Sequence, residues 1–320
     1  MYIYLDIVEG FACEMCGSCC KNNWLVTLSE ESYQRNARLF AEMGKSEEFS
    51  QIFIPITDHK GLEEYAYIAK KTEGGCWFLA EDHRCNLQKK AGHDHLDQVC
   101  QTFPRYPMNT TRGTEITLSF SCPAVLRMAS RTTPFRIIRS EVCPIAMTPN
   151  NEVLHVYPEQ QLAWNPLRYY FEIEQHFIDL MQYRCLSIIE RLQMIHDTVC
   201  AISCLVQDDS FSQQITRIFY SNYEMLDTKM EQAPTLERDI PDRIIENFFV
   251  NFIFKKPFYI YGLQPALKLM ENIWQRIEDA RRLVMNQAND IECTQMMIMT
   301  VELEYSHNRR ALLESYKASQ

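Results

Sequence analysis

Four cysteines fall within eight residues near the start of the chain, in the stretch FACEMCGSCCKNNW at residues 11–24. Their spacing is C-x2-C-x2-C-C, formed by Cys13, Cys16, Cys19 and Cys20. Two cysteines separated by two residues can turn both thiolates onto one metal ion from a tight loop. The adjacent pair Cys19–Cys20 does not easily do so, because neighbouring side chains of extended backbone diverge. One of that pair is therefore expected to serve a multi-iron cluster, a second site, or no metal.

The compartment decides how the 13 cysteines of this chain are interpreted. The first residues, MYIYLDIVEG, are acidic and lack a basic segment, so we expect no secretory signal and a cytoplasmic location. Cytosolic thiols are kept reduced, and clustered ones bind metal or do chemistry instead of forming a disulfide framework. Nine of the 13 lie at or before Cys143, so a cysteine-rich front precedes a cysteine-poor back.

Four further cysteines of the front half are widely spaced: Cys76, Cys85, Cys100 and Cys122. These intervals are typical of no single zinc finger. Together with the first cluster they make eight candidate ligands, which suit two metal sites or one iron–sulfur cluster plus spare cysteines. The alternative is that some of them are ordinary buried cysteines, which pack as small apolar residues.

The two halves of the chain differ in their expected secondary structure. Ser29 followed by Glu30 and Glu31 predicts a helix through about Met43, in a front half that otherwise reads as loops with a few short strands. From about residue 164 to 316, apolar residues recur at helical spacing. We therefore predict a mainly α protein with an irregular, cysteine-rich, metal-binding N-terminal region and a helical C-terminal half. The expected domains are 1–145 and 146–320.

The charge balance and the hydropathy exclude two classes of partner. The chain has 32 Lys plus Arg against 42 Asp plus Glu, a net charge of -10, so a phosphate backbone is not attracted and no nucleic-acid partner is expected. The most apolar stretch, FFVNFIFKKPFYIYG at 248–262, is too short to span a bilayer and contains Lys255 and Lys256. No membrane association is expected.

Three cysteine-containing segments resemble the flagellin lysine-N-methylase family, within the wider group of proteins with a C-x-x-C-x-x-C-C domain. They are CGSCCKNNWLVTLSEESY, GGCWFLAEDHRCNLQKKAGHDHLDQVCQTFPRYP and LSFSCPAV, within residues 11–125. ENFFVNFIFKKPF, at 246–258, is similar to a segment of the family's helical half. The resemblance implies a [4Fe-4S] protein that transfers a methyl group from S-adenosylmethionine to lysine side chains of a protein, flagellin-like or another.

The resemblance also suggests residues for the cofactor and the chemistry. Arg105 lies in the family-like QTFPRYP segment, and Asn251 lies within an aromatic run that could line a pocket for adenine or a lysine stem, although such runs are usually core. Both are candidate cofactor-binding residues. Glu246 is the candidate base, or a structural carboxylate paired with an arginine such as Arg243. The nine glycines contain no G-x-G, so a Rossmann-type loop for S-adenosylmethionine is absent.

A second hypothesis about the same cysteines assigns the protein to a different functional class. In it, the chain is a non-catalytic zinc- or iron-binding module that uses its metal to fold and acts as a protein-interaction domain. The first reading requires iron and sulfide in the protein, whereas the second is satisfied by stoichiometric zinc.

If metal organises the front half, then its binding free energy is also folding free energy. We expect Cys16→Ser or Cys19→Ser to lose bound metal and solubility together, and Cys293→Ser to change neither. Metal analysis of the three purified variants checks this expectation. Equal metal content in all three would contradict it.

Overall fold

The computed structural model describes residues 1–22, 24–57, 65–145, 154–232, 239–284 and 290–307. The described chain is mainly helical with small sheets, as expected, and it divides into two compact units. The cysteine-rich unit consists of residues 11–104, and the helical unit of residues 1–10 and the described residues from 105 onward. The division differs from the expected 145/146 boundary, because residues 113–118 pair with the N-terminal strand.

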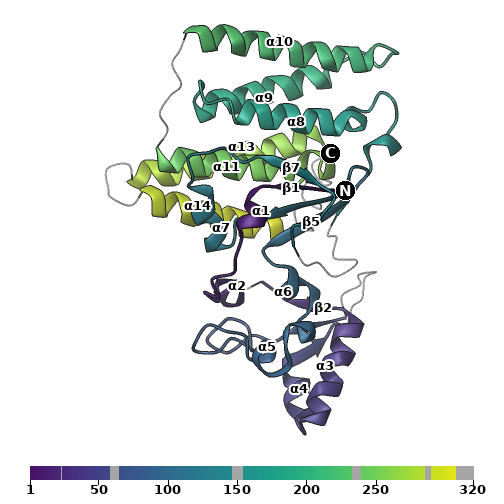
Figure 1. Ribbon diagram of the computed structural model, residues 1–320, viewed down its shortest axis with the longest axis vertical. Helices are drawn as coiled ribbons and strands as arrows, with labels where there is room; N and C mark the ends of the chain where they lie inside the picture. The colour runs from purple at the N-terminus through teal and green to yellow at the C-terminus, as the bar shows by residue number, and fades with distance from the viewer. Residues whose placement is uncertain (23, 58–64, 146–153, 233–238, 285–289, 308–320) are drawn as a thin grey trace. The chain divides into compact units, whose positions relative to one another are not determined.

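The cysteine-rich unit contains short helices around a small sheet (Figure 1). Its three strands run antiparallel in the order β2-β4-β3, with bounds Thr27–Leu28, Ala66–Ile68 and Phe53–Pro55. Its helices are α2 (Ser18–Lys21), α3 (Glu30–Glu42), α4 (Ser46–Ile52), α5 (Asn86–Ala91), a 3₁₀ turn at His93–His95, and α6 (Gln98–Thr102). The expected helix after Ser29 is confirmed, and the Ser29 side chain accepts a hydrogen bond from Ser32 N at 3.2 Å.

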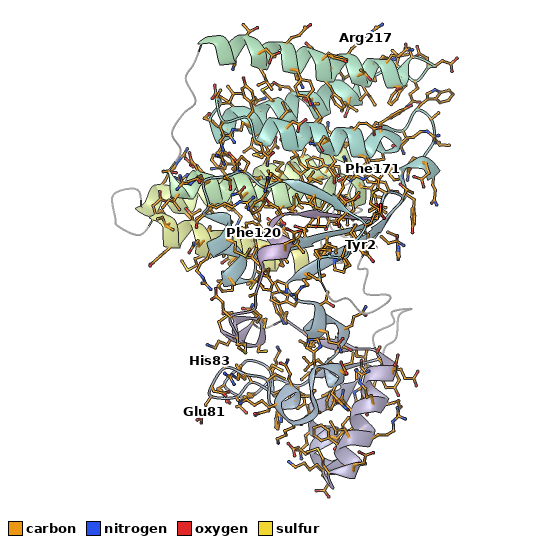
Figure 2. All side chains as sticks on the ribbon, viewed as in Figure 1. Tyr2, Glu81, His83, Phe120, Phe171 and Arg217 are labelled. Atoms are coloured by element: carbon orange, nitrogen blue, oxygen red, sulfur yellow. The ribbon has the colours of Figure 1, made fainter. Side chains whose placement is uncertain are left out.

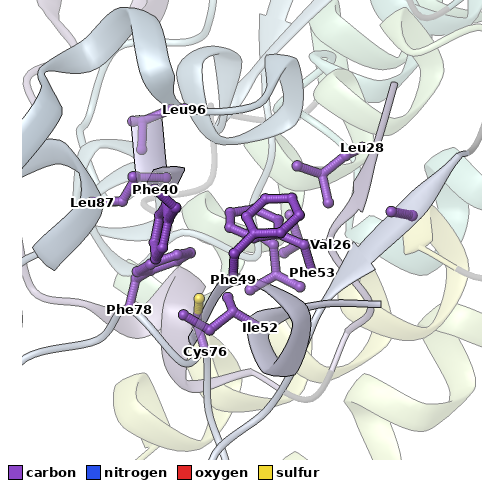
Figure 3. Close-up of a cluster of buried hydrophobic side chains, with 12 residues drawn as sticks. Val26, Leu28, Phe40, Phe49, Ile52, Phe53, Cys76, Phe78, Leu87 and Leu96 are labelled. Carbon is purple, nitrogen blue, oxygen red and sulfur yellow. The ribbon is translucent and has the colours of Figure 1, made fainter. Parts of the chain in front are cut away.

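Aromatic side chains form the core of the cysteine-rich unit (Figure 3). Phe49 and Phe53 stack with their ring centroids 4.7 Å apart, and Phe40 meets Phe53 edge to face. Cys76 is one of the buried members of this cluster, and Cys20 packs against it. The aromatic cluster therefore fixes the backbone on which part of the cysteine set is carried.

The helical unit contains a five-stranded mixed sheet in the order β7-β1-β6-β5-β8. The strand bounds are Tyr2–Leu5 for β1, Arg105–Thr110 for β5, Gly113–Leu118 for β6, Ile137–Ser140 for β7 and His155–Val156 for β8. β1 lies parallel to β6 and antiparallel to β7, and β5 and β6 form a hairpin.

The helices of this unit are arranged around α11, which packs against α7, α8 and α14. Figure 1 shows α8, α9 and α10 as successive layers. The helix bounds are α1 Ile7–Gly10, α7 Pro123–Ala129, α8 Tyr170–Met181, α9 Ile188–Ser203, α10 Phe211–Gln232, α11 Ile240–Phe254, α12 Pro257–Ile260, α13 Leu263–Val284 and α14 Asp290–His307, with 3₁₀ turns at Pro158–Gln160 and Pro166–Tyr169. Among the helices described, we find none with the length and apolar character that crossing a membrane requires.

A buried network of four charged side chains joins the sheet to the helices. Lys256, the residue before α12, donates through Nζ to Glu115 Oε2 of β6 at 2.8 Å and to Glu174 Oε1 of α8 at 2.5 Å. Arg112 donates to the same two carboxylates, at 2.8 Å and 3.0 Å, and its guanidinium lies 3.7 Å from the centroid of the Phe171 ring (labelled in Figure 2). Two positive and two negative charges balance, which offsets much of the cost of removing them from water.

Removing one charge of this network should be far more costly than removing an exposed charge. Glu174→Gln keeps the side-chain shape but leaves two cations with one carboxylate, so we expect the free energy of unfolding to fall by about 3 kcal/mol. Glu172→Gln, an exposed position on the same helix, is the matched control, with an expected change within about 0.5 kcal/mol. Urea denaturation measures both, and equal losses would contradict the role of the network.

Candidate metal centre

The second half of the first cysteine cluster is positioned by a glycine. Gly17 has φ +71° and precedes α2, which carries Cys19 and Cys20. A Cβ atom at Gly17 would lie 2.9 Å from the carbonyl oxygen of His83, which is labelled in Figure 2. Only glycine combines this backbone conformation with so close an approach. The cysteine-bearing turn is thereby held against the loop that contains His83.

A second set of backbone contacts brings the next two cysteines to the same turn. Cys76 N donates to the carbonyl oxygen of Cys20 at 2.7 Å. Gly75 has φ +80°, and a Cβ atom there would lie 3.2 Å from the same carbonyl oxygen. Cys85 forms an isolated antiparallel bridge with Leu79 and is the residue that precedes α5. Residues far apart in the sequence are therefore joined through main-chain contacts.

Five thiols of this unit influence one another electrostatically. Cys19 and Cys20 place their sulfurs 3.9 Å apart, and the hydrogen bond from Cys20 lowers the pKa of Cys19 to about 7. The same contact, then desolvation, and then the charges of Cys76 and Cys100 raise the pKa of Cys20. Desolvation raises the pKa of Cys76 and Cys85, and each of these thiols is affected by Cys19. These five residues are the candidate metal centre.

Cys100 joins this group from α6, whose first turn is capped by Asp97 through a hydrogen bond from Val99 N. Cys100 is exposed as a whole residue, but its thiol is desolvated by its neighbours. Desolvation first, and then the charge of Cys76, raise its pKa well above the ordinary value. The sulfur, and not the rest of the residue, is the potential ligand.

The other three predicted ligands lie in different surroundings. Cys13 is exposed and accepts a hydrogen bond from Met15 N at 3.4 Å, and Cys16 donates to Ser18 Oγ at 3.3 Å. Cys122 is buried in the helical unit, where it precedes α7. Of the eight cysteines predicted as ligands, five lie near enough for their charges to influence one another's pKa.

The donor chemistry of these five thiols suits a thiophilic metal. Buried thiolates that repel one another stay protonated unless a cation compensates their charge, and a bound metal supplies that cation. Among the residues that the structure describes, no three Cys, His, Asp or Glu side chains already stand close enough together to hold a metal ion. Sulfur ligands of this kind are suitable for iron–sulfur clusters and for zinc.

The predicted cofactor-binding and catalytic residues all lie in the helical unit. Arg105 begins β5. Asn251 is buried in α11, and its Oδ1 accepts a hydrogen bond from Thr117 Oγ1. These contacts place neither residue at an evident cofactor site, and both assignments stay predictions.

Glu246 is fully buried and is engaged by two arginines. Its carboxylate accepts hydrogen bonds from Arg184 Nε at 3.0 Å and from Arg191 Nη1 at 2.8 Å. Arg191 is itself fully buried. A carboxylate held between two guanidinium groups is a structural ion pair. The geometry favours the structural alternative. The arginines that pair with Glu246 here are Arg184 and Arg191, whereas Arg243 was the expected partner.

The aromatic run of residues 248–261 lies mostly in the core. Phe248, Phe249 and Phe254 are fully buried in α11. Phe248 and Phe252 also line a pocket of about 30 Å³, together with Lys255 and Glu302. A space of this size holds one or two water molecules, so it does not accommodate an adenine ring. Lys255 and Lys256 could be recognised in the sequence as charges inside an apolar run. Their carboxylate partners are distant in the sequence and could not be recognised there.

Comparison of the chain with family models, with curated proteins and with solved structures gives no match. The resemblance to the flagellin lysine-N-methylases therefore stays a prediction that rests on the quoted motifs.

The five-thiol group leads to a test with a matched control. Cys85→Ser and Cys100→Ser each remove one of the five sulfurs, and both variants should contain less bound metal than the unmodified protein. Cys204→Ser changes an exposed cysteine at the end of α9 and should retain its metal. Metal content per chain, measured after anaerobic purification, is the readout. Full retention of metal by both Cys85→Ser and Cys100→Ser would exclude this centre.

Proposed function

We propose that the chain is an iron–sulfur protein lysine N-methylase that transfers a methyl group from S-adenosylmethionine to lysine side chains of a protein substrate. The observation that supports the proposal is that Cys19, Cys20, Cys76, Cys85 and Cys100 belong to one compact unit and influence one another's pKa. The order of the cysteines in the sequence supports it through the resemblance described above.

The residues around the thiols are suited to holding a negatively charged group. Four thiolates are the usual ligands of a [4Fe-4S] cluster. The charge of Lys70 opposes the effect of burial on the pKa of Cys76, and the charge of Lys89 does the same at Cys85. Cations near thiolates favour the deprotonated, ligating form. When bound through only three cysteines, a cluster would supply an open iron position for the amino and carboxylate groups of S-adenosylmethionine.

Methyl transfer to lysine is balanced without an oxidant or reductant. The lysine nitrogen forms a bond to the methyl carbon as the carbon–sulfur bond breaks, which leaves S-adenosylhomocysteine and releases one proton. Lysine has an ordinary pKa of about 10.4, so an enzyme must favour its neutral form at neutral pH. A positive sulfonium beside the ammonium acts in that direction by like-charge repulsion. Glu246 is not needed for this step, and its ion pairs give it a structural role.

A zinc- or iron-binding interaction module is the second candidate, and one observation favours it. Cys76 belongs to the aromatic core of the cysteine-rich unit, and Cys20 and Cys85 pack against that core. A metal at this place would stabilise the fold of the unit even without catalysis.

The test of the proposal is methyl transfer by anaerobically purified protein. We expect iron and sulfide in the protein, a change in its Mössbauer spectrum on addition of S-adenosylmethionine, and transfer of label from the methyl group to lysine in protein substrates. Cys100→Ser should lose iron and transfer together, and Cys204→Ser should keep both. Colourless protein with stoichiometric zinc and no transfer would overturn the proposal in favour of the interaction module.

A further inference from the structure

The sheet of the helical unit ends in a strand, β7, whose outer edge is unpaired within the described ranges of the chain. β7 is the first strand in the order β7-β1-β6-β5-β8, and β1 is its neighbour on one side (Figure 1). On the other side, we find no main-chain partner among the described residues. An unpaired strand edge can pair with an extended segment of another chain through main-chain hydrogen bonds. The sheet can therefore gain a strand at β7.

The hydrogen-bond pattern shows which residues face this free edge. Asp6 N donates to the carbonyl oxygen of Arg136, directly before β7, at 2.9 Å, so the main chain of Arg136 faces β1. Hydrogen bonding in an antiparallel pair alternates from residue to residue. Ile137 and Arg139 therefore point their N–H and C=O groups away from β1. Two donors and two acceptors stand along the free edge.

Arginine side chains give this edge a positive charge. Residues 101–140 contain six arginines and one acidic residue, in a chain whose net charge is -10. Arg131 Nη2 contacts both carboxylate oxygens of Asp6, at 2.7 Å and 2.8 Å, which neutralises that carboxylate. Arg136 meets the same carboxylate only at 3.4 Å, and its side chain is 77% exposed. Arg139 is exposed, and among the residues that the structure describes we find no carboxylate paired with it.

The acidic residue that follows β7 does not compensate Arg139. Glu141 forms its ion pair with the amino group of Met1, at 3.9 Å. The strand ends just before it, at Ser140, whose Oγ accepts a hydrogen bond from Val142 N at 3.0 Å in a turn. Two positive charges, those of Arg136 and Arg139, therefore stay available at the edge.

The charge decides what kind of strand is suitable there. A second copy of β7 would bring arginines close together, and like charges destabilise a strand pair. A carboxylate opposite an arginine is instead a favourable cross-strand pair. Arg136 and Arg139 are three residues apart, so their side chains lie on opposite faces of the sheet. A partner strand meets both of them when its own acidic residues are three positions apart.

We propose that β7 binds an extended acidic segment of a protein partner, which adds to the sheet as a further strand and places carboxylates on Arg136 and Arg139. The main chain of Ile137 and Arg139 supplies the hydrogen bonds, and the arginines select the charge. The site lies in the helical unit and uses none of the cysteines. It is independent of the proposed methyl transfer.

The test is a titration of the full-length protein with fluorescently labelled peptides, measured by fluorescence anisotropy. The acidic probe is a short threonine and valine peptide with two glutamates three positions apart. In one comparison peptide glutamines replace the glutamates, and in another methyl groups replace the main-chain N–H hydrogens. We expect saturable binding of the acidic probe that weakens in about 0.5 M salt, and binding of each comparison peptide weaker by about tenfold or more.

Each comparison can overturn the proposal. Absence of saturable binding by the acidic probe would show that β7 does not accept such a strand. Equal binding of the glutamine peptide would remove the role of charge, and equal binding of the methylated peptide would show ion pairing without strand addition. Tighter binding of a short oligothymidylate than of the acidic probe would overturn it in favour of a phosphate ligand.

Two variants locate the binding, and a third is the control. Ile137→Pro removes an N–H of the free edge and leaves the hydrogen bonds to β1 in place, so it should weaken binding of the acidic probe by about fivefold. Arg139→Gln removes one charge and should weaken binding by about threefold to fivefold, which tests the site even if the proline variant does not fold. Arg217→Gln removes an exposed arginine of α10, labelled in Figure 2, and should bind as the unmodified protein does. Unchanged binding in Arg139→Gln would show that the peptide binds elsewhere and would overturn the proposal.

Discussion

The buried ion network of Lys256, Arg112, Glu115 and Glu174 is the interaction on which the helical unit depends. It ties the β5–β6 hairpin to α8 and to the turn between α11 and α12. Lys256 adopts a left-handed backbone conformation, with φ +69°, that costs a non-glycine residue about 1 kcal/mol or more. The fold maintains this conformation because the ammonium meets two carboxylates there. The same turn sets the position of Lys255, which faces a different carboxylate in a different place.

The cysteine-rich unit is held together by other means. It has an aromatic core of its own, two glycines that allow cysteine-bearing loops to approach each other, and thiols that would repel one another if they ionised together. The apolar cluster holds the backbone in place. The negative charge of ionised thiols is avoided by protonation or compensated by a metal. Both units thus contain buried groups that can carry a charge, and the charge is compensated in different ways. In one the compensation comes from side chains, and in the other the thiols stay protonated or are compensated by a metal.

Local patterns predicted local structure well. Ser29 with the acidic residues after it identified α3, because an N-cap acts within one turn. The mainly helical character followed from apolar spacing in the same way. The segment TEITLSFSCP gave no indication that its strand lies parallel to β1, more than 100 residues away, and this pairing assigns Cys122 to the helical unit. The carboxylate partners of Lys255 and Lys256 are likewise distant in sequence. The sequence therefore showed two charges in an apolar run but not the ion pairs that they form.

The connection between the units has a consequence for how the chain folds. The helical unit begins with β1, and the strand that pairs with it, β6, follows only after the whole cysteine-rich unit. During synthesis, β1 must therefore wait for residues 11–104 to emerge before its sheet can close. An unfolded insertion makes that closure entropically more costly and slower, and a compact one shortens the effective loop. Any ligand that folds the cysteine-rich unit early would thus also speed the assembly of the sheet in the helical unit.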